Sequence, residues 1–571
     1  MMKIKLLIYC LLVAFTVLSV NFCGVLTDST NELIVNLVTP KGQILGHALQ
    51  SYNGNNYYAF QEIPYAAPPV GDLRYQLPQR HPGWTGVLNC TNNTKVCPQP
   101  QSTYLEQDED CLFANVYTPV KPGSNIFLPV YVWIHGGGYA VWDGGFQRYN
   151  PSYLIDHNMV IVTFNYRLGA LGFLATDDCV IPGNLGLKDQ NFLLKWVSEN
   201  IHLFGGDSSK VTIGGESVGS SSVANHILSK MSTGLFRGGI QESGSAINYY
   251  NFVPSPSVYA YKLAQVLDNS IKPKTTNTTE LLDFLKKAKV SDIIAAEVQF
   301  PAVATGGMLL SDLIWAPTLE NNCTAEPFLS KPMHEAFING DFNRVPLLIG
   351  FCSEEMLYFS PASITTIAFK IPTWEVFNEL AGNLDQNIEH IAHDELNVVN
   401  SKRSEVSEQI RRLYTNSSFA NDSYAYIKIS SDLYFIHGIV RQAEIASQFI
   451  PVYMYEFDYT ADNTFPFPGT QHTEELRYMW GNVEDLPFNN TFQPIMKERM
   501  CRLWSNFITY QNPTPSKCDP KLLNLQWPTV KPTSTNYVSI NKKFRTYSNP
   551  RRYNHIRSIL LKYLQNPRMV Y

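Results

Sequence analysis

Short, strongly apolar runs alternate along this chain with segments of helical periodicity. Strands that are buried on both faces give such runs, because the helices that connect parallel strands cover both faces of the sheet. We therefore predict an α/β fold with a large, mostly parallel central sheet and helices on both faces. The predicted strands are Val130 to Ile134, Met159 to Tyr166, Val211 to Ile213, Val345 to Phe351 and Pro451 to Tyr459, and a helix is predicted from Asn191 to Ile201.

The 571 residues show no boundary between domains. Length alone would suggest several domains, but no Pro-rich or Gly/Ser-rich spacer, charge block or repeat divides the chain. We predict a single domain over residues 24–571. The composition, 44% hydrophobic and 16% charged, is typical of a globular protein with a large core. A formal net charge of −5, without a basic cluster, argues against a nucleic-acid partner.

The first residues have the pattern of a secretory signal peptide. Lys3 and Lys5 precede an apolar run from Leu6 to Val20, and small residues such as Ser19 and Gly24 follow. A membrane anchor is the alternative, but the run is shorter than the ~20 residues that a membrane-spanning helix needs. The last residues offer no hydrophobic tail for a lipid anchor. We predict a signal peptide over residues 1–23, no stable membrane anchor, and a secreted, extracellular protein.

Two further features agree with secretion. Seven Asn-x-Ser/Thr sites are candidates for glycosylation, at Asn89, Asn92, Asn277, Asn322, Asn416, Asn421 and Asn489. The chain has ten cysteines, of which Cys10 and Cys23 fall within the predicted signal peptide. Some of the others should be paired in an oxidising compartment, although their spacing does not give the connectivity. No Cys-x-x-Cys or paired Cys/His spacing indicates zinc, and no metal is expected.

One predicted strand runs directly into the sequence GGESVGSSS, residues 214–222, and a helical pattern follows. Ser217 therefore stands between glycines where a strand turns into a helix, which is the position of an activated serine nucleophile. The short pattern alone is weak evidence, because it recurs by chance in long chains. An activated serine also needs a histidine base, an acid that orients the histidine, and N–H donors for an oxyanion.

In enzymes whose serine lies on such a strand-to-helix turn, the catalytic acid and then the histidine follow the serine along the chain. The histidines that satisfy this order are His390, His393, His437, His472 and His555. His472 is the best candidate because it lies in a loop soon after a predicted strand, where the imidazole can reach over the sheet. Glu354 and Glu355 follow another strand and cannot both face the histidine. The residues alone do not choose between them, and the other carboxylate is expected to be solvated or to cap a helix.

Three glycines, Gly136 to Gly138, follow the predicted strand that ends at Ile134. Glycine costs backbone entropy, so three in a row after a strand need a reason. A loop without side chains lets backbone N–H groups close around a substrate oxygen, and we interpret this one as an oxyanion loop. A plain glycine turn is the alternative.

The chain contains, in this order, EIPYAAPPVGDLRY, EDCLFANVYTP, HGGGY, TFNYRLGALGFL, GNLGLKDQ, GGESVG, QESGSA and WSNFITYQNPTP. This series resembles the type-B carboxylesterases, the cholinesterase-like branch of the α/β-hydrolases, and the insect members more than the vertebrate ones. The resemblance runs from about Asn31 to the C-terminus. A series of motifs in fixed order is far more specific than any one of them.

The resemblance implies roles for individual residues. The family's acid and histidine segments match the residues that end at Glu355 and His472, so the implied catalytic triad is Ser217, Glu355 and His472. The implied oxyanion donors are the N–H groups of Gly137, Gly138 and Val218. The family's first disulfide implies a Cys97–Cys111 pair. Enzymes of this kind use no cofactor.

The chain also departs from the family pattern. Val218 stands where alanine is usual, and its side chain is expected to crowd the acyl side of the site. Glu62 replaces a glycine, which puts the local backbone geometry in doubt, and Met356 stands where many members have a small residue. A second family disulfide is absent, and Cys352 has no obvious partner.

The sequence therefore predicts a secreted serine esterase that hydrolyses small-molecule carboxylic esters through a Ser-His-Glu triad and an acyl-enzyme intermediate. The alternative is a non-catalytic, cholinesterase-like adhesion or binding protein. Choline esters are not favoured, because the loop between Cys97 and Cys111 lacks the tryptophan with which cholinesterases bind quaternary ammonium. Glu216 also differs from the glutamine that juvenile hormone esterases have before the serine. The residues leave the natural ester and the oligomeric state open.

Overall fold

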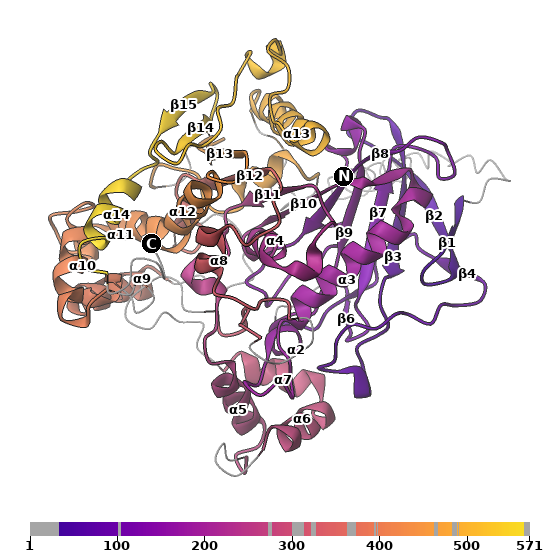
Figure 1. Ribbon diagram of the computed structural model, residues 1–571, viewed down its shortest axis with the longest axis horizontal. Coiled ribbons are helices and arrows are strands. Elements are labelled where there is room, and N and C mark those ends of the chain that lie inside the picture. Colours follow the sequence, from indigo (N-terminus) through magenta and orange to yellow (C-terminus); the bar gives the residue numbers. More distant parts are fainter. Residues whose placement is uncertain are drawn as a thin grey trace, which may run out of the picture. The chain divides into compact units, whose positions relative to one another are not determined.

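The computed structural model describes most of the chain (Figure 1). The described residues are 33–100, 104–271, 277–299, 313–320, 327–361, 373–392, 396, 398–461, 466–481, 488 and 490–564. The predicted signal peptide over residues 1–23 lies outside them, as do His393 and the glycosylation candidates Asn322 and Asn489. Residues Ile34–Tyr571 form one compact unit.

One mixed sheet of thirteen described strands forms the centre of the fold (Figure 1). Its order is β1-β2-β3-β7-β9-β8-β10-β11-β12-β13-β14-β15, and β4 pairs with β2 outside this path. All pairs from β9 to β14 are parallel, whereas β2–β3, β3–β7, β7–β9 and β14–β15 are antiparallel. The strands are β1 Leu33–Leu37, β2 Gly42–Gln50, β3 Asn56–Pro64, β4 Val87–Asn89, β7 Phe113–Thr118, β8 Leu128–Ile134, β9 Val160–Phe164, β10 Gly206–Glu216, β11 Gly238–Glu242, β12 Leu347–Cys352, β13 Val452–Phe457, β14 Asn536–Ile540 and β15 Arg545–Ser548.

Helices connect and cover the strands (Figure 1). They are α2 Gly169–Phe173, α3 Leu185–Asn200, α4 Val218–Leu228, α5 Pro256–Leu267, α6 Thr278–Lys287, α7 Val290–Glu297, α8 Met333–Asn339, α9 Trp374–Gln386, α10 Arg403–Arg411, α11 Ser423–Ser431, α12 His437–Ala446, α13 Gln493–Tyr510 and α14 Tyr553–Leu560. The five predicted strands correspond to β8, β9, β10, β12 and β13, and the predicted helix corresponds to α3, which begins earlier than expected.

The parallel strands are buried because helices pack against both of their faces. Neighbouring residues of a strand point to opposite faces, and the first two residues of β11 show what lies on each side. A Cβ atom on Gly238 would lie 1.8 Å from Gln511, directly after α13, whereas one on Gly239 would lie 3.2 Å from Ile227 of α4. The helices α4 and α13 therefore cover opposite faces, and the predicted α/β fold is confirmed.

Aromatic side chains fill the space between the sheet and α13. Trp133 of β8 packs against Trp480 with their ring centroids 5.2 Å apart, and Tyr455 of β13 packs against Trp504 of α13 at the same separation. The indole of Trp504 also donates a hydrogen bond of 2.7 Å to the carboxylate of Glu242 at the end of β11. Because that carboxylate is fully buried, the bond offsets part of the cost of placing a polar group in the core.

The predicted site residues follow the carboxyl ends of the parallel strands. β8 ends just before the glycine loop, β10 ends just before Ser217, β12 ends shortly before Glu355, and β13 leads into the loop that carries His472. These strands lie near one another in the sheet. Since the carboxyl ends of parallel strands meet at one edge, the fold brings segments distant in sequence to a common place.

Candidate active site

The turn at Ser217 is held in a backbone conformation that L residues rarely adopt. Ser217 has φ 58° and ψ −126° and lies directly between β10 and α4. Its N–H donates to the carbonyl oxygen of Glu242 at 2.8 Å, and its own carbonyl oxygen accepts from the N–H of Ser221 at 3.0 Å. Strained residues of this kind persist only where their surroundings fix them, and they concentrate at functional sites.

The glycine that follows the turn is required by packing. A Cβ atom on Gly219 would lie 2.1 Å from the carbonyl oxygen of Ile134, at the end of β8. Such a contact is far inside van der Waals distance, so any side chain would push α4 away from the sheet. The Gly-x-Ser-x-Gly pattern thus reflects the close approach of a strand and a helix, as well as the chemistry of the serine.

The two acid candidates have different partners. Glu355 Oε2 lies 2.6 Å from Nδ1 of His472, and Glu355 Oε1 accepts the N–H of Cys352 at 2.8 Å. Glu354 instead pairs with the guanidinium of Arg551 at 2.9 Å. The expectation that the second carboxylate is solvated was wrong, because Glu354 is only 5% exposed and is held by this ion pair. Glu354 does occupy the N-cap position of the 3-10 turn Glu355–Leu357, but its carboxylate makes no capping hydrogen bond.

The imidazole of His472 lies between two carboxylates. Its Nε2 atom is 2.9 Å from Glu216 Oε1, on the side opposite to Glu355, although the two groups do not have hydrogen-bond geometry. Burial disfavours the imidazolium, but the charges of Glu216 and Glu355 outweigh it and raise the pKa of His472 well above its ordinary value. Burial in turn raises the pKa of Glu216, against the lowering influence of His472.

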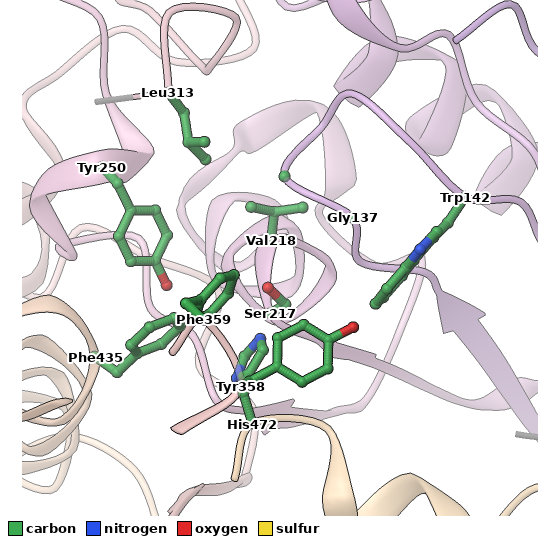
Figure 2. Close-up of a pocket in the computed structure, with 11 residues that line it drawn as sticks. Gly137, Trp142, Ser217, Val218, Tyr250, Leu313, Tyr358, Phe359, Phe435 and His472 are labelled. Atoms are coloured by element: carbon green, nitrogen blue, oxygen red, sulfur yellow. The ribbon is translucent and has the colours of Figure 1, made fainter. Parts of the chain in front are cut away.

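Ser217 and His472 line the same pocket (Figure 2). Within the described residues, Nε2 of His472 has no hydrogen-bond partner, so no hydrogen bond joins it to the Ser217 hydroxyl. The predicted proton transfer therefore requires Nε2 and the Ser217 hydroxyl to come into hydrogen-bond contact. Sequence reasoning did not foresee the contact with Glu216, although a glutamate directly before the serine was a visible signal.

The glycine loop is shaped to present N–H groups. Gly137 and Gly138 have φ 95° and 63°, and a Cβ atom on Gly137 would lie 2.2 Å from the carbonyl oxygen of Val141. In the described part of the chain, the N–H groups of Gly137, Gly138 and Val218 donate no hydrogen bond. All three residues line the pocket (Figure 2), so their donors can serve a substrate oxygen.

The rest of the pocket wall is apolar and was not predicted. It is formed by Trp142, Tyr250, Leu313, Tyr358, Phe359 and Phe435, which come from widely separated segments. Three of these rings surround His472, and the nearest, Phe435, has its centroid 4.8 Å from that of the imidazole. The pocket therefore contains a tryptophan, Trp142. It does not come from the loop between Cys97 and Cys111, where cholinesterases carry their choline-binding tryptophan.

Other predicted features have visible places in the structure. The disulfide Cys97–Cys111 is present, with an S–S distance of 2.06 Å. Glu62, at a position where the family has glycine, has φ 60°, and Cys352 donates to Glu475 Oε2 at 2.9 Å. The described glycosylation candidates are all exposed: Asn89, Asn92, Asn277, Asn416 and Asn421. In the parts of the chain that are described, no group of three or more His, Cys, Asp or Glu side chains is arranged to hold a metal ion.

A model of the carboxylesterase family matches residues 31–557 of the chain. The chain belongs to the carboxylesterase family. It is 33% identical over 448 residues to a carboxylic ester hydrolase of Bombus ignitus, covering 75% of each protein. It is 29% identical over 555 residues to a juvenile hormone esterase of Tribolium castaneum, covering 91% of this chain and 90% of that one.

Solved structures of carboxylesterases have the same fold. The juvenile hormone esterase of Manduca sexta, solved with OTFP covalently attached, superposes with a TM-score of 0.79 at 26% identity, over 93% of this chain and 99% of that one. A PNB esterase superposes with a TM-score of 0.73 at 27% identity, over 93% of this chain and all of that one. The protein is a carboxylic-ester hydrolase with the α/β-hydrolase fold, and its substrates are small-molecule esters.

Proposed function

We propose that the protein hydrolyses carboxylic esters by a double displacement at Ser217. The observation that carries this proposal is the convergence of Ser217, the Glu355–His472 pair and three N–H groups on one apolar pocket, and these N–H groups have no partner among the described residues. These are the parts that an activated serine needs, and the fold brings them together from four strand ends.

In the first step, the Ser217 oxygen attacks the ester carbonyl carbon while its proton passes to Nε2 of His472. The carbonyl oxygen becomes an oxyanion, which the N–H groups of Gly137, Gly138 and Val218 stabilise. Collapse of this intermediate breaks the bond to the alkoxide oxygen, and the imidazolium gives its proton to the leaving alcohol. An acyl group then remains on Ser217.

In the second step, a water molecule attacks the acyl carbon and gives its proton to the same nitrogen. The proton returns to Ser217 as the carboxylic acid leaves. Glu355 accepts a hydrogen bond from Nδ1 of His472 throughout, so it fixes the tautomer and stabilises the imidazolium. Glu216, 2.9 Å from Nε2, adds a second negative charge beside the imidazolium.

We further propose that the enzyme acts outside the cell. The support is the apolar run after Lys3 and Lys5, the disulfide Cys97–Cys111 and the exposed glycosylation candidates. Among the described helices, none has the length and apolar character needed to cross a bilayer. Expression in insect cells, with N-terminal sequencing and glycosidase treatment of the medium, tests this part.

A burst experiment tests the chemistry. Mixing the purified protein with p-nitrophenyl acetate should release about one equivalent of p-nitrophenol before the steady state, because this activated ester should acylate Ser217 faster than water removes the acyl group. The Ser217→Ala protein should show neither burst nor turnover while it remains folded and secreted. A folded parent protein without turnover of any ester would instead support the non-catalytic binding protein.

A further inference from the structure

Trp142 combines a place in the pocket with an unusual backbone. It lines the same pocket as Ser217, and its φ is 82° (Figure 2). A bulky residue with positive φ is a genuine outlier, because its Cβ crowds the backbone, whereas glycine would adopt this conformation without strain. The surroundings must therefore hold Trp142 in place, and strain retained at a binding site indicates a role there.

A buried glutamine fixes the backbone of Trp142 from both sides. The Gln99 side chain accepts the N–H of Trp142 at 2.8 Å and donates to its carbonyl oxygen at 3.1 Å. Gln99 is 2% exposed and also donates to the carbonyl oxygen of Cys97, which belongs to the disulfide with Cys111. The two-point contact ties the position of the indole to this cross-linked segment.

One face of the indole already carries a cation. The guanidinium carbon of Arg148 lies 4.8 Å from the ring centroid, and Asp143 lies 3.8 Å from Arg148 Nε. A ring attracts a cation through the negative potential of its faces, and a guanidinium on one face reduces that attraction for a second positive group. The indole is therefore suited to a neutral partner.

The pocket extends to both sides of Ser217. Figure 2 shows Trp142 on the opposite side of Ser217 from Tyr250 and Phe435. The leaving oxygen must approach Nε2 of His472, which lies 2.9 Å from Glu216 Oε1. A Cβ atom on Gly136 would lie 2.9 Å from the same carboxylate, and Gly136 belongs to the loop that contains Trp142. The leaving alcohol is thus directed to the Trp142 side.

We propose that Trp142 determines specificity for the leaving group, as an aromatic wall against which a flat, uncharged alcohol moiety packs. The inference rests on the proposed ester hydrolysis at Ser217. It narrows the substrates to esters of benzyl-like, phenolic or otherwise planar alcohols, and it disfavours esters of quaternary ammonium alcohols.

The test compares two acetate esters whose alcohols differ in flatness and are similar in leaving ability, benzyl acetate and cyclohexylmethyl acetate. The parent enzyme should have the higher kcat/KM for the benzyl ester. In Trp142→Gly this preference should fall by about two- to ten-fold, the size expected for the loss of one aromatic pair. Trp142→Phe should restore most of it, because the ring is kept.

Three controls separate the alternatives. Trp142→Leu keeps apolar area without a ring and should behave like the glycine variant. Methyl phenylacetate and methyl cyclohexylacetate differ only in the acyl group, so their rate ratio should not change with Trp142. Acetylcholine should be a poorer substrate of the parent than its neutral isostere, 3,3-dimethylbutyl acetate.

A parent enzyme that hydrolyses no ester would refute the proposed function itself, independently of the substitutions at Trp142. An active parent whose benzyl preference is the same in folded Trp142→Gly would overturn the inference. An equal loss on both acetate esters would also overturn it, because Trp142 would then only support the site. If the substitutions changed only the rate ratio of the two methyl esters, Trp142 would contact the acyl group and not the alcohol. If the parent preferred acetylcholine to its neutral isostere, the inferred preference for an uncharged alcohol would be wrong.

Discussion

Replacing Glu355 by glutamine should disable the base without disturbing the fold. Glu355 Oε1 accepts the N–H of Cys352 at 2.8 Å, and Oε2 faces Nδ1 of His472 at 2.6 Å. In the glutamine variant the amide oxygen should keep the bond to the N–H of Cys352, so the NH₂ group faces Nδ1. That nitrogen must then accept a hydrogen bond, and the ring proton moves to Nε2, which can no longer take the proton of Ser217.

The expected loss follows from this change of tautomer and from the lost charge. Serine hydrolases whose triad acid is replaced by its amide lose up to about 10⁴ in kcat. Here Glu216 leaves a second carboxylate 2.9 Å from the ring, which can offset part of the missing charge. We therefore expect kcat to fall by about 10²–10⁴, equivalent to about 2.7–5.4 kcal/mol in the barrier.

The neighbouring residue provides the matched control. Glu354→Gln removes a charge of the same kind one position away, but its partner is Arg551, which keeps an ion pair of 2.7 Å with Asp432. We expect kcat within a few-fold of the parent and a loss of about 1–3 kcal/mol in the free energy of unfolding, because a buried pair is weakened.

The assignment of the triad acid is tested by two measurements on the parent, Glu355→Gln and Glu354→Gln. These are steady-state kcat with p-nitrophenyl acetate and the midpoint of thermal unfolding. Glu355→Gln should lose activity and keep its unfolding midpoint. Glu354→Gln should keep its activity and unfold at a lower temperature. If Glu355→Gln retained kcat within ten-fold of the parent while Glu354→Gln lost it, the assignment of the triad acid would be refuted.

Three other substitutions test separate parts of the account. Glu216→Gln removes the anion beside Nε2 and should lower the pKa of His472, so the acid limb of the kcat/KM profile should move to lower pH; an unmoved limb would contradict this. Val218→Ala should raise kcat/KM for butyryl over acetyl esters, by a factor within about 10 to 200, since Val218 lines the pocket; an unchanged acyl preference would show that its side chain does not meet the substrate. Gly219→Ala places a Cβ 2.1 Å from the oxygen of Ile134 and should abolish the folded, active protein, so normal yield and activity would disprove the packing argument.

The parallel strands were predictable because they are buried on both faces. β8, β9, β12 and β13 are short apolar runs, and such runs identify a covered sheet without further information. β11 was missed because its sequence, GGIQE, has one aliphatic residue and looks like a loop. Its glutamate is fully buried and accepts a hydrogen bond from Trp504, far along the chain.

The start of α3 was missed for a related reason. The helix begins at Leu185, and its first turns contain Lys188 and Asp189, both buried. Polar residues at core positions hide the apolar periodicity that predicts a helix. Lys188 is satisfied by Glu320 at 2.6 Å and Asp189 by Arg167 at 2.7 Å, and both partners lie outside the helix.

The site was predictable where local geometry determines it. Ser217 and the glycine loop follow strands directly, so the roles proposed for them could be inferred from position. The choice between Glu354 and Glu355 could not be inferred from position, because it depends on Arg551, 197 residues away in the chain from Glu354. The resemblance to carboxylesterases favoured Glu355, whereas the residues alone left both open.

Covalent labelling of Ser217 tests the central claim most directly. The enzyme should react with diethyl p-nitrophenyl phosphate, release one equivalent of p-nitrophenol and lose its esterase activity in the same proportion. Peptide mass spectrometry should then find a single diethylphosphoryl group on Ser217, and the Ser217→Ala protein should remain unlabelled. Full esterase activity after exposure, or an adduct on another residue that accompanies the loss of activity, would contradict the account.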